Sequence, residues 1–439
     1  MLLGAGLLVA GCGGPERPTI SSADNTSEED AQKKRLVEIL DGRAKALQAK
    51  DEAAFLADLD QSNDKLIEQE KALFANLRQF KFKQFRYLSN KAMLPDIVEG
   101  GSEFGPIIQI AQLDVDDGPG GVAPGETYKY RLVRKDGKLV VGGITGANLS
   151  NASDGAMSGP LADSPWHFGP LKVIQAGNVW LAADRTVSDL DRYAAVAERE
   201  ARWVEALWGD RTRFPGHVLF FTKDAENLKK WFSVGASDKG EDFIETILGF
   251  QHRTDGVRKD GSVYKGQYAG ARIAVNLGNI LRSKEDPART VRHELAHAVT
   301  SRATVVTSIG ALFGAPTWAV EGFASWTEGV DNAGNRASVR SEVARGVAAG
   351  KFKGRTPDQT EFYGKDISFN YALGSTVFRY AEQTKGRDAA VEFYARIIEH
   401  IEGSGFTATP AFDGICQRVL GMSGGAFMER WAGFVRRGA

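Results

Sequence analysis

The sequence predicts an α+β protein of two units, the second of which joins a mixed sheet lobe to a helical lobe. Three observations predict this class. Helical patterns precede strand-like runs between residues 33 and 165, strand-like runs and one long helix occupy residues 166–277, and helical patterns prevail from residue 286 onward. With 42% hydrophobic and 25% charged residues among 439, the chain is long enough for two or three domains.

The extreme N-terminus is an apolar run that ends at a cysteine. The segment from Leu8 to Cys12 resembles a bacterial lipobox, in which small residues admit a signal peptidase and the cysteine becomes the lipidated N-terminus. The resemblance implies a signal peptide over residues 1–12, a lipid anchor at Cys12 and an extracytoplasmic location at a bacterial cell membrane. No basic residue precedes the run, which leaves a start upstream of Met1 open. The Ser-, Asp- and Glu-rich residues 13–32 predict a flexible tether.

Residues 33–165 form the first predicted unit. Its helical stripes comprise Leu36, Ile39, Leu40, Ala44 and Leu47, then Leu66, Leu73, Leu77 and Phe80. Strand-like runs follow at 107–113, 128–133 and 139–144, with a hairpin turn at 134–138. This order, with the phrase Ala-Leu-Gln-Ala-Lys-Asp at 46–51, resembles the nuclear transport factor 2-like cone. We find no catalytic dyad in it and expect a spacer or a recognition module for an unknown partner.

The second unit, residues 166–439, opens with β-rich segments. Strands are expected at Val179 to Ala182 and at Val218 to Phe221. Between them, Ser188 to Asp191 caps an amphipathic helix that ends near Gly209. Residues 272–277 alternate in polarity and predict a further strand.

A helix that is capped by Asp286 and begins at Pro287 carries the most informative motif. Asp is a favoured N-cap, and Pro suits the first helical position. His293 and His297 are four residues apart, so they lie on one helical face and can share a zinc ion, while Val291, Leu295 and Ala298 form a buried stripe. Glu294 beside them can remove a proton from an attacking water. The pattern indicates a metallopeptidase, although a helix with two hydrogen-bonded histidines would show it too.

A catalytic zinc usually has three protein ligands, so a third must lie elsewhere. The metzincin pattern is excluded because Thr300 and Ala303 stand where it requires glycine and histidine. Glu321 is the remaining option, in an apolar segment, 316–324, that begins after a proline like a second helix. It has no basic residue within four positions, and a buried carboxylate is costly unless it is paired or bound to metal. Zinc would satisfy it.

These motifs resemble the peptidase MA-like gluzincins, whose members join a His-Glu-x-x-His helix to a downstream Trp-x-x-Glu-Gly helix. Trp318 to Gly322 matches the second element, and the resemblance extends through Asn370 to Ser375 and on to Phe427 to Trp431. It covers roughly residues 166–439. The resemblance implies a gluzincin fold with Zn2+ in a cleft between the sheet lobe and the helical lobe. Carried over residue by residue, it makes His293, His297 and Glu321 the zinc ligands and Glu294 the general base.

The resemblance also implies a later tyrosine that hydrogen-bonds the oxyanion. Tyr371 is the matching position, Tyr363 competes with it, and a packed core tyrosine is the alternative for Tyr371. Zn2+ is the only cofactor implied. We expect residues 272–277 to be the edge strand that pairs with an extended peptide substrate, unless they form an ordinary sheet strand. The chain lacks the Gly-x-Met-x-Asn element of related aminopeptidases, which favours an endopeptidase.

The leading hypothesis is therefore a membrane-anchored, extracytoplasmic zinc metallopeptidase that acts on peptides or proteins. A catalytically silent zinc-binding envelope lipoprotein and a hydrolase of another amide or glycan-linked wall substrate remain alternatives. The sequence has no basic stripe and no basic cluster interleaved with aromatic residues, which argues against nucleic-acid binding. His167, His217, His252 and His400 have no metal-ligand spacing, and Cys416 lies in an apolar helical context, so we expect all five to be structural.

Overall fold

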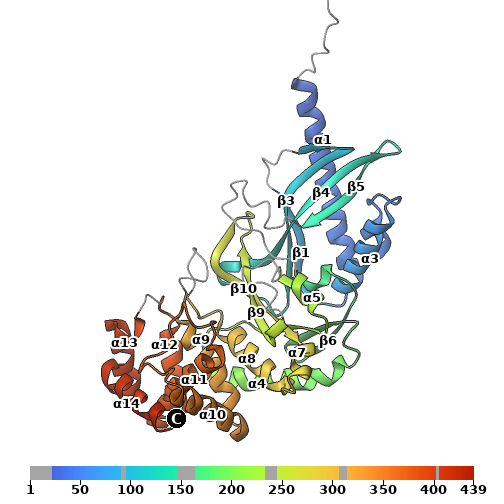
Figure 1. Cartoon of the computed structure of the whole chain (residues 1–439). Helices are drawn as coiled ribbons and strands as arrows, with labels where there is room; N and C mark the ends of the chain where they lie inside the picture. Colours follow the sequence, from blue (N-terminus) through green and yellow to red (C-terminus); the bar gives the residue numbers. More distant parts are fainter. Residues whose placement is uncertain (1–21, 90–94, 147–163, 233–244, 306–313, 402–404) are drawn as a thin grey trace, which may run out of the picture.

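The computed structural model describes residues 22–89, 95–146, 164–232, 245–305, 314–401 and 405–439 (Figure 1). The helices and strands of the N-terminal part are α1 (Ser22–Ala49), α2 (Glu52–Leu56), α3 (Asp64–Leu77), β1 (Phe82–Ser89), β2 (Asp96–Val98), β3 (Gly101–Leu113), β4 (Ala123–Lys135) and β5 (Lys138–Gly146). Next come β6 (Leu171–Ala176), β7 (Val179–Asp184), α4 (Leu190–Trp208), β8 (His217–Thr222), α5 (Ala225–Lys230), β9 (Gly249–Val257), β10 (Val263–Asn276), α7 (Leu277–Arg282) and α8 (Pro287–Thr300). The last elements are α9 (Thr317–Gly329), α10 (Ala333–Ala348), α11 (Ile367–Lys385), α12 (Arg387–Ile397), α13 (Pro410–Ile415) and α14 (Gly424–Arg436).

The described strands form one curled, mixed sheet. Its ten strands include a path in the order β1-β3-β4-β9-β10-β8-β7-β6, with β2 added to β3 and β5 added to β4. The pairs β7–β8 and β8–β10 are parallel, and the other named pairs are antiparallel. The sheet crosses the predicted boundary at residue 165, because β4 pairs with β9 through Ala123 with Val257 and Pro124 with Gly256.

The central strands are buried on both faces. Successive side chains of a strand point to opposite faces, and in β7 Val179 and Leu181 join the core under α4 and α8, whereas Trp180 and Ala182 join the core of α1, α2 and α3. This explains why β7 and β8 are buried throughout instead of alternating in polarity. The N-terminal helices therefore cover the sheet face opposite α8.

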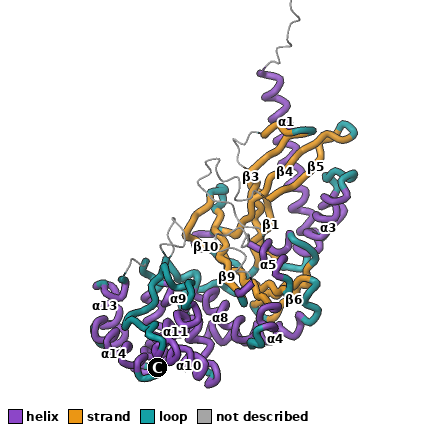
Figure 2. The backbone as a smooth tube through the Cα atoms, in the orientation of Figure 1, coloured by secondary structure: helices purple, strands orange, loops and turns teal. Residues whose placement is uncertain are grey.

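The described residues from α9 to the C-terminus form the helical lobe that the sequence predicts. Helices α9 to α14 gather at the lower left of Figure 1, and Figure 2 shows that this region is built from helices and loops while the strands lie above it. Helices α9 and α11 cross with their backbones nearly touching. A Cβ atom added at Gly322 would lie 2.5 Å from the carbonyl carbon of Gly374, so glycine is required there.

Several predicted elements are confirmed. The helix N-cap at Asp286, the hairpin turn at residues 134–138 and the strands at 179–182 and 218–221 are all present. Helix α4 ends at Gly209, as expected. Cys416 is a free, fully buried thiol, although it lies in a π-helical turn, and burial raises its pKa to about 12.

Two expectations are wrong. Residues 22–32 of the predicted tether belong to helix α1. Glu28, Glu29, Ala31 and Gln32 favour helix and lead without a break into the buried stripe that begins at Leu36. The rest of the tether and Cys12 lie outside the described residues. The strand at residues 272–277 is not an edge strand. It is the end of β10, which pairs with β8 on one side and β9 on the other.

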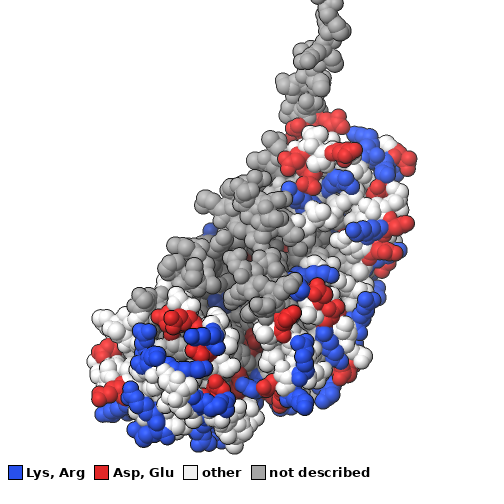
Figure 3. Space-filling model, viewed as in Figure 1, with Lys and Arg blue, Asp and Glu red and all other residues white. Residues whose placement is uncertain are grey.

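Figure 3 shows Lys and Arg interspersed with Asp and Glu over the described surface of one face of the molecule. Within the described ranges, no helix is both long and apolar enough to cross a membrane.

Candidate metal centre

Helix α8 is fixed between the sheet and the helical lobe, which sets the direction of its histidines. The predicted stripe of Val291, Leu295 and Ala298 is fully buried. Arg292 donates to the buried Glu200 of α4 over 2.6 Å, so a charged hydrogen bond ties the helix to its neighbour. The opposite face of α8 is left to present His293 and His297 toward α9.

His293, His297 and Glu321 meet in one cluster, called here the His-His-Glu cluster. The two Nε2 atoms are 3.2 Å apart, and Glu321 Oε2 lies 3.3 Å from His293 Nε2 and 3.1 Å from His297 Nε2. Each residue offers one ligand atom to a shared point, so the three are close enough to bind one metal ion.

The spacing of these atoms fits zinc. A tetrahedral site with Zn–N bonds of about 2.0–2.1 Å separates its ligand atoms by about 3.3–3.4 Å, close to the observed distances. The charge also fits, because three buried carboxylates, those of Glu294, Glu321 and Glu328, surround two imidazoles. A divalent cation would neutralise a charge that is otherwise costly to bury.

Glu328 and Arg289 support the cluster through the Nδ1 side of His293, and neither residue was predicted from the sequence. His293 Nδ1 donates to Glu328 Oε1 over 2.7 Å, so Nε2 is the ring nitrogen directed at the cluster. Arg289 Nε donates to the other oxygen of Glu328. Helical spacing could have identified both residues. Glu328 lies two helical turns after Glu321 on the same face of α9, and Arg289 lies one turn before His293.

The electrostatics of the cluster follow from burial and these contacts. Burial alone would lower the pKa of His293, but hydrogen bonds to Glu321 and Glu328 raise it well above its usual value. Burial opposes ionisation of Glu321 and Glu328, yet their histidine partners lower the pKa of each carboxyl, that of Glu321 most strongly. The cluster is thus rich in buried negative charge, which favours a cation.

Glu294 lies on the next face of α8 and is 6% exposed. Burial, with the charges of Glu321 and Glu328, raises its pKa against the effect of the two histidines. Strand β9 passes close beside it: a Cβ atom added at Gly249 would lie 3.1 Å from Glu294 Cγ and 3.1 Å from Thr290 Cγ2. A raised pKa is the property expected of a carboxylate that accepts and returns a proton.

Both predicted tyrosines lie at the cluster. Tyr363 donates its hydroxyl to Glu321 Oε1 over 2.6 Å. The ring of Tyr371 is centred 5.8 Å from that of His293. Desolvation of the hydroxyls and the charge of Glu321 raise the pKa of both tyrosines well above the usual value, so each keeps its proton and can donate a hydrogen bond. Tyr363 as a whole is 45% exposed.

The edge strand beside the cluster is β9. Its inner side pairs with β10, whereas its outer side pairs with β4 only at Gly256 and Val257. No other described strand pairs with the outer edge from Gly249 to Asp255. The open edge strand expected at residues 272–277 is therefore β9.

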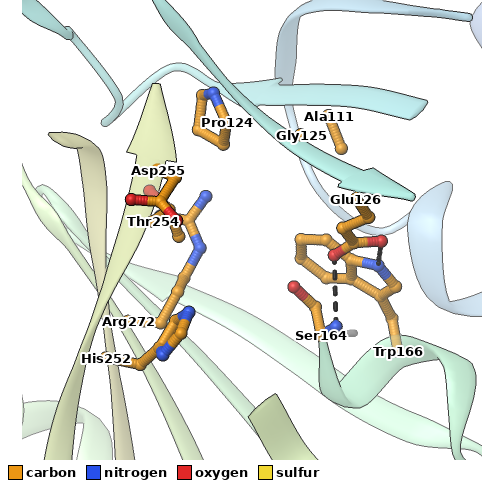
Figure 4. Close-up of a pocket in the computed structure, with 10 residues that line it drawn as sticks. All are labelled: Ala111, Pro124, Gly125, Glu126, Ser164, Trp166, His252, Thr254, Asp255 and Arg272. Atoms are coloured by element: carbon orange, nitrogen blue, oxygen red, sulfur yellow. Dashed lines mark hydrogen bonds between the residues drawn. The ribbon is translucent and has the colours of Figure 1, made fainter. Parts of the chain in front are cut away.

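A separate polar cavity of about 80 Å³ lies on the other face of β9. Figure 4 shows Arg272 and His252 on one wall and Glu126 and Trp166 on the other. Glu126 accepts hydrogen bonds from Ser164 N over 3.2 Å and from Trp166 Nε1 over 3.3 Å, and Arg272 forms a bidentate ion pair with Asp116. Because Gly249 faces Glu294 and side chains alternate along β9, His252 points away from the His-His-Glu cluster.

The histidines outside the His-His-Glu cluster contact other side chains. His167 contacts Glu126 and His217 contacts Glu205, which agrees with structural roles. Cys12 and residues 306–313 of the link between the ligand helices lie outside the described residues.

Comparisons with known proteins add little. No protein-family model and no curated protein matches the chain. Among solved structures it resembles a two-domain M1 zinc metallopeptidase in complex with L-tryptophan, with 11% identity and a TM-score of 0.34. The match covers 69% of this chain and 58% of that chain, so it spans less than two thirds of the neighbour. The function of this chain is therefore inferred from the geometry of the His-His-Glu cluster itself.

Proposed function

We propose that the protein is a zinc-dependent metallopeptidase with an endopeptidase activity. The observation that carries the proposal is the mutual approach of His293 Nε2, His297 Nε2 and Glu321 Oε2 to 3.1–3.3 Å, with Glu294 buried one residue from the first ligand. Zinc held by these three residues would supply a Lewis acid that activates water and polarises a carbonyl.

The protein's own residues would perform the proton transfers. Glu294 takes a proton from the attacking water on one carboxylate oxygen and passes it to the departing amine, so that the peptide bond breaks as a carboxylate and an amine form. The raised pKa of Glu294 suits a group that must hold the proton between the two steps. A tyrosine hydroxyl, Tyr371 first and Tyr363 second, donates to the carbonyl oxygen as negative charge develops there.

The substrate would lie along β9 in an extended conformation. The outer edge from Gly249 to Asp255 offers backbone N–H and C=O groups for strand addition, and Gly249 brings that edge against Glu294. Binding through backbone groups along an open edge does not depend on a free peptide terminus, which supports internal cleavage. The absence of the Gly-x-Met-x-Asn element supports it as well.

The experiment measures bound zinc and hydrolysis of a denatured protein for the wild type, Glu294→Gln and His293→Ala. We expect the wild type to bind one zinc and cleave, Glu294→Gln to keep zinc and lose cleavage, and His293→Ala to lose both. Zinc without hydrolysis in the wild type would favour the silent envelope lipoprotein. Unchanged zinc binding in His293→Ala would overturn the site.

We further propose that Cys12 anchors the protein outside the cytoplasm through a lipid. The lipobox-like sequence from Leu8 to Cys12 supports this placement. Expressed in a bacterial host from a gene that includes any upstream start, the wild type should fractionate with membranes and Cys12→Ser should not. Equal release of both from the membrane fraction by salt alone would contradict the anchor.

A further inference from the structure

Arg253 on β9 is a cation for which the described part of the chain provides no acidic partner. It is only partly exposed, and among the described residues no carboxylate lies within ion-pair distance of it. Its guanidinium carbon lies 5.2 Å from the ring centre of Tyr268, a cation–π contact that is weaker than an ion pair. A half-buried charge with so little compensation is the kind of group that a ligand can satisfy.

The strand places Arg253 on the same side of the sheet as the His-His-Glu cluster. Gly249 packs against Glu294, and residues two and four positions further along a strand share its face, so Gln251 and Arg253 both point toward α8 and the helical lobe. The contacts agree with this orientation. Tyr268 packs against the core beneath α8, and the charge of Arg253 lowers the pKa of Tyr363, opposing the larger effects of burial and Glu321.

A second donor on this face also lacks a partner. Gln251 Nε2 is buried and finds no acceptor among the described residues. Unsatisfied buried donors are rare in folded proteins and require an explanation. Gln251 and Arg253, two residues apart on the face of the edge strand that points toward α8, therefore present hydrogen-bond donors with no acceptor among the described residues.

We propose that Arg253 recognises an acidic side chain of a peptide bound along β9, which makes this a peptidase for acidic sequences. The proposal rests on the proposed function, because it assumes that the peptide lies on the outer edge of β9. Gln251 would donate a second hydrogen bond to the bound peptide near the same position.

The geometry sets where the acidic residue belongs. Arg253 lies four residues beyond Gly249, which is about 13 Å along an extended strand. The outer edge already pairs antiparallel with β4, and a peptide continuing that ladder would run opposite to β9. The Asp or Glu would then lie about three to five residues N-terminal to the bond that is cleaved.

The test begins with the wild type acting on a mixture of denatured proteins, with cleavage sites mapped by mass spectrometry. We expect Asp and Glu to be enriched at one position three to five residues before the cleaved bond. A pair of peptides carrying Glu or Gln at that position is then cleaved by the wild type, Arg253→Gln, Arg253→Lys and Arg253→Glu.

Arg253→Gln should lower kcat/KM for the Glu peptide by about tenfold and leave the Gln peptide within about twofold. Arg253→Lys should keep most of the preference, and Arg253→Glu should prefer a Lys peptide. Arg258→Gln, an exposed position just beyond β9, is the matched control and should change neither rate.

The possible outcomes distinguish the role of Arg253 from the peptidase activity itself. Cleavage without acidic enrichment, or an Arg253→Glu variant that keeps the wild-type preference, overturns the role of Arg253 and leaves the peptidase standing. Acidic enrichment C-terminal to the bond, lost in Arg253→Gln, supports recognition by Arg253 with a parallel peptide. If the wild type cleaves no protein, the proposed function fails and the inference fails with it.

Discussion

Glu328 accepts a hydrogen bond from His293 Nδ1 at 2.7 Å and is itself held by Arg289. The interaction orients the His293 ring and aims Nε2 at the neighbouring Nε2 of His297 and at Glu321. Metal-binding histidines commonly depend on such a carboxylate for both orientation and basicity.

Glu328→Gln should therefore weaken zinc binding while leaving the three ligands in place. We expect a loss of about 10–100-fold in affinity, the range typical of such supporting residues. Competition with a chromogenic chelator measures it. Glu399→Gln, an exposed carboxylate on the helical lobe, is the control and should bind zinc like the wild type. Equal affinity in Glu328→Gln would show that His293 is oriented by its packing alone.

Substitution of Tyr371 and of Tyr363 should have different effects on kcat and on zinc affinity. Tyr371→Phe should lower kcat by about 10²-fold or more without changing zinc affinity, because it removes an oxyanion donor. Tyr363→Phe should weaken zinc binding several-fold, because its hydroxyl bonds Glu321 directly. Steady-state kinetics and zinc titration of both variants check this. A larger loss of kcat in Tyr363→Phe would exchange the two assignments.

Gly322→Ala should disturb the crossing of α9 and α11. The added methyl would lie 2.5 Å from the backbone of Gly374, so the helices must separate, at a cost of about 1–3 kcal/mol or more in the free energy of unfolding. Because Gly322 follows Glu321, zinc affinity should fall as well. Gly425→Ala in α14 meets no atom within 4 Å and is the matched control. Thermal unfolding midpoints compare them, and an unchanged midpoint for Gly322→Ala would contradict the close crossing.

The N-terminal unit should be required for folding of the sheet that supports α8. Trp180, Val218 and Phe220 pack in one core with α1, α2 and α3, so a chain beginning at residue 165 would expose this apolar face. We expect that chain to aggregate, whereas one beginning at residue 22 should elute as a soluble, zinc-binding protein. Size-exclusion chromatography measures both. A monodisperse chain from residue 165 would show that the two units fold independently.

His252 should make stability depend on pH. Burial, together with the charge of Arg272, lowers its pKa to about 4 against the opposing charge of Glu126, whereas the unfolded chain has the usual value of 6.5. Between these values the unfolded state binds more protons, so stability rises with pH across this window and falls on acidification, by up to roughly 3 kcal/mol.

The variant His252→Gln should lose this part of the pH dependence. Urea unfolding of the wild type and the variant at several values between pH 4 and 7 isolates the difference. Parallel stability curves for the two proteins would show that His252 does not titrate as its burial requires.

The sequence by itself determined the local chemistry of the site. Helix periodicity fixes His293 and His297 on one face of α8, and Asp286 with Pro287 sets where that helix starts, because capping and side-chain spacing are properties of neighbouring residues. The isolated carboxylate of Glu321 in an apolar helix likewise indicates a partner from elsewhere. These features needed no tertiary information, and the fold brings all three residues together.

The tertiary structure decided which distant groups surround that chemistry. The edge strand is β9 and not β10, because β10 pairs with a neighbouring strand on each side. Strand pairing depends on neighbours that meet only when the chain folds, and a β-rich run looks the same in a central or an edge strand. Glu328 could be placed on the face of Glu321, but its choice of His293 as partner follows from the packing of α8 on α9. The sharing of one sheet by both units arises through pairing of β4 with β9, between residues more than a hundred positions apart, which no local pattern encodes.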